Sequence, residues 1–264
     1  MAEKPVLLYE KKLDGRVVVM TMNRPDAMNA INGELGQALG EAWERFRDDD
    51  EAWVAIITGA GDKAFSAGAD LKETTLIRTG QLKPVRRRRV SAFPMAEEIG
   101  LWKPTIAAIN GFAIAGGWAI AQQCDIRLAA AHAELGVSEV RWNMPASWLH
   151  TLPRQMLLGH ALELVLWGDR RITAQRAYEI GWVNRVVPGE HLMDEAMEWA
   201  ERILYLAPRD VRNLKEILYR GSYMSPMEGA AFARALEQNL AGMEDSIEGP
   251  KAFSEKRKPR FKNK

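Results

Sequence analysis

Short runs of apolar residues divide the first half of the chain into predicted strands. Residues 53–58, 105–109 and 126–130 are almost continuously apolar, which is typical of strands that are fully buried. Two earlier runs, residues 6–10 and 17–22, are separated by Asp14-Gly15, a dipeptide that favours a tight turn. The pattern predicts an α/β core that begins with an antiparallel hairpin.

Helical spacing of apolar residues dominates the rest of the chain. Asn32 and Thr173 each precede such a pattern, and their side chains are suited to capping the first turn of a helix. Three further helices are predicted without a strand between them, over residues 191–206, 208–219 and 226–242.

The change from mixed to purely helical patterns suggests two parts. We expect a core domain over residues 1–200 and a C-terminal helical region over residues 201–264. The basic end of that region, residues 256–264, is expected to fray.

The composition argues against several classes of protein. Thirty-six Lys and Arg residues against 35 Asp and Glu residues leave a net charge of +1, so no general attraction to nucleic acid or membrane is expected. No apolar run approaches the roughly 18 residues of a membrane span, and the N-terminus has no signal-like apolar stretch. Cys124, the single cysteine, excludes an internal disulfide and fits a reducing, cytoplasmic location.

Two further features carry little functional signal. Arg86 to Arg89 form a basic run that fits a solvated helix face, with contact to an anionic substrate as the alternative. The four histidines show no ligand spacing, so no metal site is expected.

Two glycine-containing turns are candidates for binding an oxyanion. Residues 103–125 read as a strand, a turn and a helix that starts near Gly116-Gly117, where backbone N–H groups are left without partners. Residues 64–72 form a second small-residue turn that enters a helix. Two such turns can direct two N–H groups at one point, although both can equally serve close packing.

Glu139 is the candidate acid–base residue. It lies among apolar residues, a setting that raises the pKa of a carboxyl group if the side chain is buried. The alternative is an exposed glutamate, or one that is ion-paired with the nearby Arg141.

Taken together, these pieces resemble the crotonase, or enoyl-CoA hydratase/isomerase, superfamily. The matching segments run in order along almost the whole chain: residues 23–30, 65–72, 103–117, 124–126, 177–187 and 248–257. The resemblance implies a spiral of ββα repeats with C-terminal helices used for trimerisation, so a homotrimer or hexamer is expected. It also implies an acyl-CoA thioester substrate, with coenzyme A as part of the substrate and no separate cofactor.

The resemblance assigns roles to individual residues. The N–H groups of Ala69 and Gly116 correspond to the donors that hold the thioester oxygen as it becomes an enolate. Glu139 corresponds to one of the two glutamates of a typical hydratase. The same motifs suggest five residues that contact the substrate: Ala67, Asp70, Leu71, Lys72 and Gly117. Two tryptophans, Trp142 and Trp148, are expected either to line the acyl pocket or to pack in the core.

The chain departs from the typical hydratase at Ala119. This alanine occupies the position of the first glutamate and cannot transfer a proton. Enoyl-CoA hydration with Glu139 alone is the favoured function. The alternatives are Δ3,Δ2-enoyl-CoA isomerisation, a hydroxycinnamoyl-CoA hydratase-lyase type of reaction, and a catalytically silent acyl-CoA-binding subunit.

Overall fold

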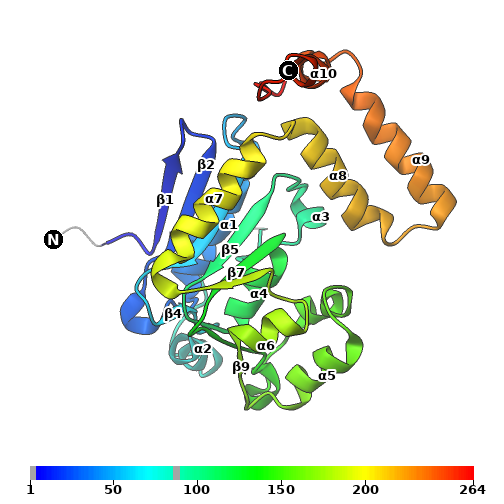
Figure 1. Ribbon diagram of the computed structural model, residues 1–264. Helices are drawn as coiled ribbons and strands as arrows, with labels where there is room; N and C mark the ends of the chain where they lie inside the picture. Colours follow the sequence, from blue (N-terminus) through cyan, green and yellow to red (C-terminus); the bar gives the residue numbers. More distant parts are fainter. Residues whose placement is uncertain (1–3, 86–89) are drawn as a thin grey trace.

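The structure consists of two sheets with helices packed around them (Figure 1). This computed structural model describes residues 4–85 and 90–264, so the run Arg86 to Arg89 lies outside the described residues. The larger sheet has the order β1-β2-β3-β5-β7-β10 and the smaller one the order β4-β6-β8-β9. Their strands are β1 (Leu7–Lys12), β2 (Val17–Met22), β3 (Val54–Gly59), β4 (Ala64–Ser66), β5 (Thr105–Ile109), β6 (Phe112–Ile114), β7 (Ile126–Ala130), β8 (Glu134–Gly136), β9 (Ile172–Thr173) and β10 (Arg185–Val187).

The predicted hairpin is confirmed. Strand β1 pairs antiparallel with β2, and Leu7 lies opposite Met22. The turn between them places Leu13, Asp14 and Gly15 at positive φ, a conformation that glycine and aspartate tolerate better than most residues. The first strand extends two residues beyond the predicted end, to Lys12.

The three predicted buried strands form the centre of the larger sheet. Strands β3, β5 and β7 run parallel to one another, and every residue of β3 and β5 is buried. After each of these strands the chain adds a short strand, β4, β6 or β8, to the smaller sheet. The result is a repeated strand–strand–helix unit, in agreement with the spiral of ββα repeats that the resemblance implied.

Both predicted helix caps are confirmed. The Asn32 side chain accepts a hydrogen bond from the N–H of Leu35, and Thr173 accepts one from the N–H of Arg176.

The helices are α1 (Gly33–Asp48), α2 (Leu71–Arg78), α3 (Ala96–Ile99), α4 (Gly116–Gln123), α5 (Leu158–Leu166), α6 (Ala174–Glu179), α7 (Leu192–Leu204), α8 (Pro208–Gly221), α9 (Pro226–Glu237) and α10 (Glu244–Ser254). Five 3-10 helices complete the described elements: η1 (Pro25–Ala27), η2 (Glu139–Trp142), η3 (Ser147–Arg154), η4 (Gly189–His191) and η5 (Gln238–Leu240).

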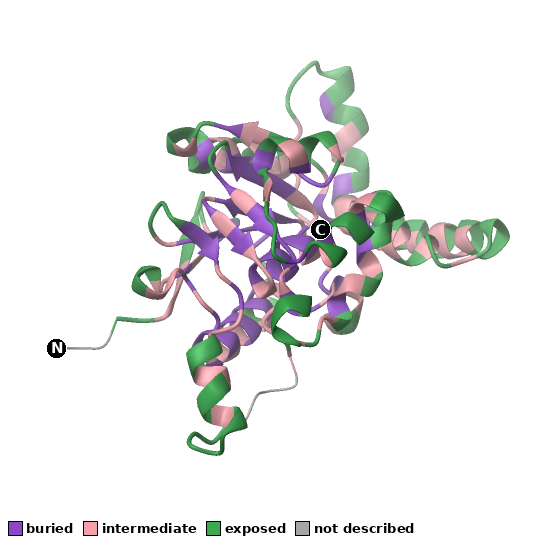
Figure 2. Cartoon of the chain, turned by 90° about the horizontal axis from the view of Figure 1, so that it is seen from below, coloured by how far each residue is buried: buried purple, intermediate pink, exposed green. Residues whose placement is uncertain are grey.

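The last three helices extend away from the sheets, whereas α7 lies against β3, β5 and β7 (Figure 1). Figure 2 shows the buried residues concentrated in the sheets and the helices beside them, and α9 contains no buried residue. We therefore describe α8, α9 and α10 as the C-terminal arm. The division of the chain near residue 200 stays a prediction.

The end of the chain is ordered, so the expectation of fraying is wrong. Arg257 forms an ion pair with Glu248, with nitrogen–oxygen distances of 2.6 and 2.8 Å. The Asp245 carboxylate accepts hydrogen bonds from the backbone N–H groups of Lys262 and Asn263. The tail thus folds back onto α10 because two acidic side chains of that helix bind it.

A partly buried polar cluster joins the arm to the core. The Asp125 carboxylate accepts hydrogen bonds from the backbone N–H and the hydroxyl of Thr105 and from the hydroxyl of Tyr219. It also pairs with Lys215 at 2.9 Å, and the ammonium group of that lysine donates to the carbonyl of Lys103. Since Lys215 and Tyr219 belong to α8, one carboxylate holds the base of the arm against β5.

Within the described residues, none of the helices combines the length and apolar character that a membrane crossing requires.

Candidate active site

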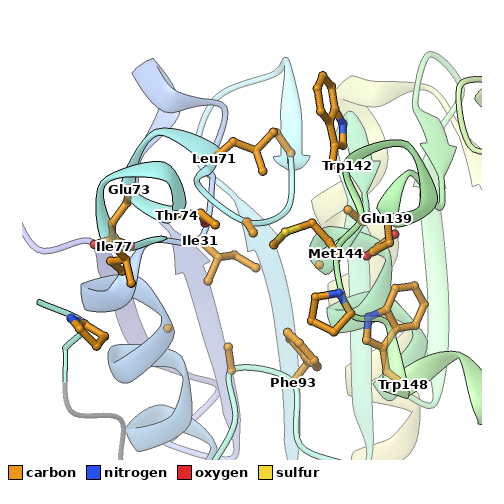
Figure 3. Close-up of a pocket in the computed structure, with 18 of the residues that line it drawn as sticks. Ile31, Leu71, Glu73, Thr74, Ile77, Phe93, Glu139, Trp142, Met144 and Trp148 are labelled. Atoms are coloured by element: carbon orange, nitrogen blue, oxygen red, sulfur yellow. The ribbon is translucent and has the colours of Figure 1, made fainter. Parts of the chain in front are cut away.

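A cavity of about 610 Å³ lies between α2 and the segment that follows β8 (Figure 3). Its walls are mainly apolar and aromatic, with a few polar groups among them. Side chains labelled in Figure 3 include Ile31, Leu71, Glu73, Thr74, Ile77, Phe93, Glu139, Trp142, Met144 and Trp148. An apolar cavity with a few converging polar groups is the usual form of a small-molecule site.

Two backbone N–H groups meet at this cavity, from the two turns singled out in the sequence. Gly116 is the first residue of α4, and a methyl group built on it would lie 3.7 Å from the Ala69 nitrogen. Ala69 faces Ile31 in a parallel bridge whose hydrogen bonds involve Gly68 and Asp70, so the Ala69 N–H points away from that bridge. Within the described part of the chain, neither N–H donates to another group.

The backbone around these donors adopts uncommon conformations. Gly68 has φ +86°, and a methyl group there would come within 3.0 Å of the Gly116 nitrogen. Ala115 precedes α4 with φ 55° and ψ −119°, which costs a residue with a side chain roughly 1–3 kcal/mol. Such strain is commonly found where a functional site over-determines the backbone.

Gly117 is buried and is not part of the described lining. A methyl group on this residue would lie 2.2 Å from the carbonyl oxygen of Ser66. Glycine here therefore allows the first turn of α4 to approach β4, which sets the position of Gly116. The residue predicted to contact substrate has a packing role in the structure.

We expect Gly117→Ala to reduce turnover about 100-fold or more, because the methyl group pushes the Gly116 N–H away from Ala69. Steady-state kinetics on an enoyl-CoA thioester measures the loss. Gly159→Ala, in the open position of α5 where a methyl group meets nothing within 4 Å, is the matched control and should retain activity. Equal activity of both variants would mean that the close approach of Gly117 to the Ser66 carbonyl oxygen does not position the Gly116 N–H.

Glu139 is buried at the edge of the cavity. Its side chain is on the first turn of η2, and the residue is 5% exposed. Burial raises the pKa of this carboxyl group to about 7, against smaller opposing effects of hydrogen bonds from the backbone N–H groups of Glu139 and Ser138. The Oε2 atom has no hydrogen-bond partner among the described residues. Arg141 instead stacks over Trp142, so the alternatives of an exposed or ion-paired glutamate do not hold.

The two tryptophans take different positions in the lining. Trp148 is buried in the wall, and Trp142 is 51% exposed at the rim. The side-chain amide of Gln122, on α4, donates to the carbonyl of Trp148 and to the hydroxyl of Thr151. The fully buried Gln122 thus fixes the 3-10 helix that carries Trp148.

The residues on either side of Ala69 divide between those that line the cavity and those that support its wall. Ala67 and Leu71 line the cavity. Asp70 does not, because its carboxylate caps α2 and pairs with Arg24 at 3.1 Å. Lys72 is exposed and also lies outside the described lining.

Ala119 is fully buried and is not among the described residues that line the cavity. The described lining contains one carboxylate besides Glu139, that of Glu73, and it accepts a hydrogen bond from the Gly33 N–H at 2.7 Å. A second glutamate beside the two N–H donors is therefore missing from the described lining.

Sequence reasoning missed much of the cavity wall. Residues 72–102 gave no periodic signal, yet they contribute Glu73, Thr74, Ile77, Arg78 and Phe93. Met144 was also missed. The described residues contain no cluster of three or more His, Cys, Asp or Glu side chains that could hold a metal ion.

Comparisons with known proteins agree with this geometry. The sequence model of the enoyl-CoA hydratase/isomerase family matches residues 12–264. The chain is 36% identical to (E)-benzylidenesuccinyl-CoA hydratase of Thauera aromatica and 38% identical to carnitinyl-CoA dehydratase of Salmonella enteritidis PT4, over 95% of this chain and 97% of each relative. The crystal structure of enoyl-CoA hydratase from Mycobacterium tuberculosis H37Rv superposes with a TM-score of 0.88 at 32% identity, over 99% of this chain and 100% of that one. The predicted fold class is confirmed, and the chain belongs to the enoyl-CoA hydratase/isomerase family of the crotonase superfamily.

Proposed function

We propose that this acyl-CoA enzyme adds water to an enoyl-CoA thioester, or removes it, with Glu139 as the only acid–base residue. The observation that carries the proposal is the buried Glu139 carboxyl group. It shares a cavity with the N–H groups of Ala69 and Gly116, which donate to none of the described residues.

In the proposed reaction, the thioester oxygen accepts hydrogen bonds from those two N–H groups. The Glu139 carboxylate takes a proton from water, and the resulting hydroxide oxygen bonds to the β-carbon. The electrons of the double bond move onto the carbonyl oxygen, where each donor is worth about 2.7–4 kcal/mol to the developing enolate. The Glu139 carboxyl group then returns its proton to the α-carbon, which leaves a 3-hydroxyacyl-CoA and the original carboxylate.

Two relatives whose names specify hydration or dehydration support this assignment. Ala119 favours a second candidate, double-bond isomerisation, because a single carboxyl group suffices to move one proton between two carbons. A hydratase-lyase type of reaction on an aromatic enoyl-CoA remains the third candidate within the family.

Assays with crotonyl-CoA and a 3-enoyl-CoA, run side by side, test the proposal. We expect hydration of crotonyl-CoA, seen as loss of the conjugated enoyl absorbance. Isomerisation of the 3-enoyl-CoA without hydration would favour the second candidate. Turnover of an aromatic enoyl-CoA alone would favour the third, and binding without any turnover would indicate a silent acyl-CoA-binding subunit.

The cofactor requirement, oligomeric state and cellular location of the enzyme are also proposed. Coenzyme A enters as part of the substrate and no other cofactor takes part. Exposed apolar side chains on the C-terminal arm, such as Leu218, Met227 and Phe253, support assembly into a homotrimer or hexamer. The single buried Cys124 supports a reducing, cytoplasmic location.

The proposed role of Glu139 predicts how activity depends on pH. The carboxyl group must be ionised to accept a proton from water, and its pKa is raised to about 7. We therefore expect kcat/KM to rise about tenfold per pH unit below 7 and to level off above it. A rate profile measured from pH 5 to pH 9 checks this, and a rate that is flat across pH 6–8 would contradict Glu139 as the base.

A further inference from the structure

The cavity contains one cationic side chain within its described lining, that of Arg78. Arg78 lies in the last turn of α2 and is exposed at the cavity rim. Its guanidinium group donates to the Met144 sulfur at 3.1 Å. A thioether is a weak acceptor, and a guanidinium group has five N–H donors, so the described residues leave most of the hydrogen-bonding capacity of Arg78 unused.

The acidic groups of the described lining do not neutralise Arg78. Glu73 binds the backbone N–H of Gly33, at the start of α1, where a negative charge is favourable. Glu139 is buried, and its raised pKa makes it largely neutral below pH 7. Neither glutamate forms an ion pair with Arg78 in the described structure, and arginine keeps its charge at all physiological pH values.

The position of Arg78 relative to the two N–H donors indicates which part of a substrate it meets. The thioester oxygen has to lie at Ala69 and Gly116, and the acyl carbons have to lie on the side that Glu139 reaches. Met144 belongs to that side, because its N–H donates to the Glu139 carbonyl and its side chain lies beside Glu139 in the cavity (Figure 3). Arg78 contacts Met144 and is therefore placed next to the acyl chain.

We propose that Arg78 determines substrate specificity by binding a second carboxylate on the acyl chain. The substrate class is then the CoA monothioester of an unsaturated dicarboxylic acid, whose apolar middle section contacts walls such as Ile77 and Phe93. A guanidinium group can hold a carboxylate through two parallel hydrogen bonds, which gives direction as well as attraction. The inference rests on the proposed function of the cavity and specifies its substrate.

Binding of saturated thioesters tests the proposal without requiring turnover. Calorimetry would compare glutaryl-CoA with valeryl-CoA, and adipoyl-CoA with hexanoyl-CoA, so that each pair differs mainly in the terminal carboxylate. We expect the better-fitting carboxylated ligand to bind about 10- to 100-fold more tightly than its neutral partner. Arg78→Gln should abolish this preference, and Arg78→Lys should retain part of it.

Arg202→Gln is the matched control, since Arg202 is also an exposed arginine in the last turn of a helix, α7, and lies outside the cavity. It should leave the preference for carboxylated ligands unchanged. If Arg78→Gln weakens all four thioesters and free CoA equally, Arg78 binds a CoA phosphate and the proposal is overturned. A wild-type protein that shows no preference for the carboxylated ligands overturns it as well.

Failure of the proposed function would look different. In that case no enoyl-CoA thioester is hydrated, while the carboxylate preference and its loss in Arg78→Gln persist. Kinetics on glutaconyl-CoA and crotonyl-CoA adds a second measurement: Arg78→Gln should lower kcat/KM for the former about tenfold or more and change the latter little.

Discussion

Glu139→Gln is expected to lower turnover of an enoyl-CoA thioester by about 10³-fold or more, because no other described carboxyl group replaces it at the two N–H donors. The amide side chain has nearly the same size but can neither accept a proton from water nor return one to carbon. Binding of a saturated acyl-CoA should change little, since Ala69 and Gly116 bind the thioester through their backbone. Steady-state kinetics and calorimetry on one preparation separate the two effects.

The stability of Glu139→Gln supplies the control for folding. The pKa of Glu139 rises from 4.5 to about 7 on folding, so ionising this group above pH 7 destabilises the folded protein by about 3 kcal/mol. This cost is absent below pH 4.5, where the group is protonated in both states, and it grows as the pH rises to 7. The variant should therefore melt above wild type at pH 8 and together with it at pH 4. Retained turnover in a variant with this melting behaviour would remove Glu139 from the mechanism.

Asp125→Ala is expected to lower the free energy of unfolding by about 3–5 kcal/mol. Lys215 is a buried residue, 9% exposed, and the substitution leaves its ammonium group without a carboxylate partner. It also removes the acceptor of the Tyr219 hydroxyl. Urea denaturation at fixed protein concentration measures the loss. Limited proteolysis should show earlier cleavage in the C-terminal arm, because both partners lie on α8.

Asp169→Ala is the control for this prediction, since Asp169 is exposed in the turn after α5. It should change stability by less than about 0.5 kcal/mol. The double variant Asp125→Asn with Lys215→Met should be less destabilised than the sum of the single changes, because it removes both charges together. Strict additivity would mean that the two groups do not interact.

The sequence contained enough local information to predict the larger sheet but not the smaller one. Strands β3, β5 and β7 are runs of five or six mostly apolar residues, and their burial follows from composition alone. Strands β4, β6 and β8 have three residues each, too few to show a period, and their pairing depends on contacts between distant segments. The tail shows the same limit, because its order depends on Glu248 and Asp245 of α10.

The candidate site was predictable where motifs and burial act locally. The apolar surroundings of Glu139 indicated its burial, and two small-residue turns indicated a pair of oxyanion donors. The resemblance to the crotonase superfamily then identified Ala69 and Gly116 as those donors. What could not be predicted was which neighbours of these residues face the cavity. Asp70 is used as a helix cap, whereas Arg78, eight residues later, lies in the wall.

The burial of Ala119 restricts how this enzyme can evolve. Its side chain has no exposed surface, and its neighbour Trp118 is stacked against Trp182 with ring centroids 3.8 Å apart. A glutamate introduced at position 119 has to displace packed neighbours, at a cost of about 1–3 kcal/mol, before it can contribute to catalysis. A second carboxylate at this position is therefore expected only together with smaller side chains among the neighbours that pack around it.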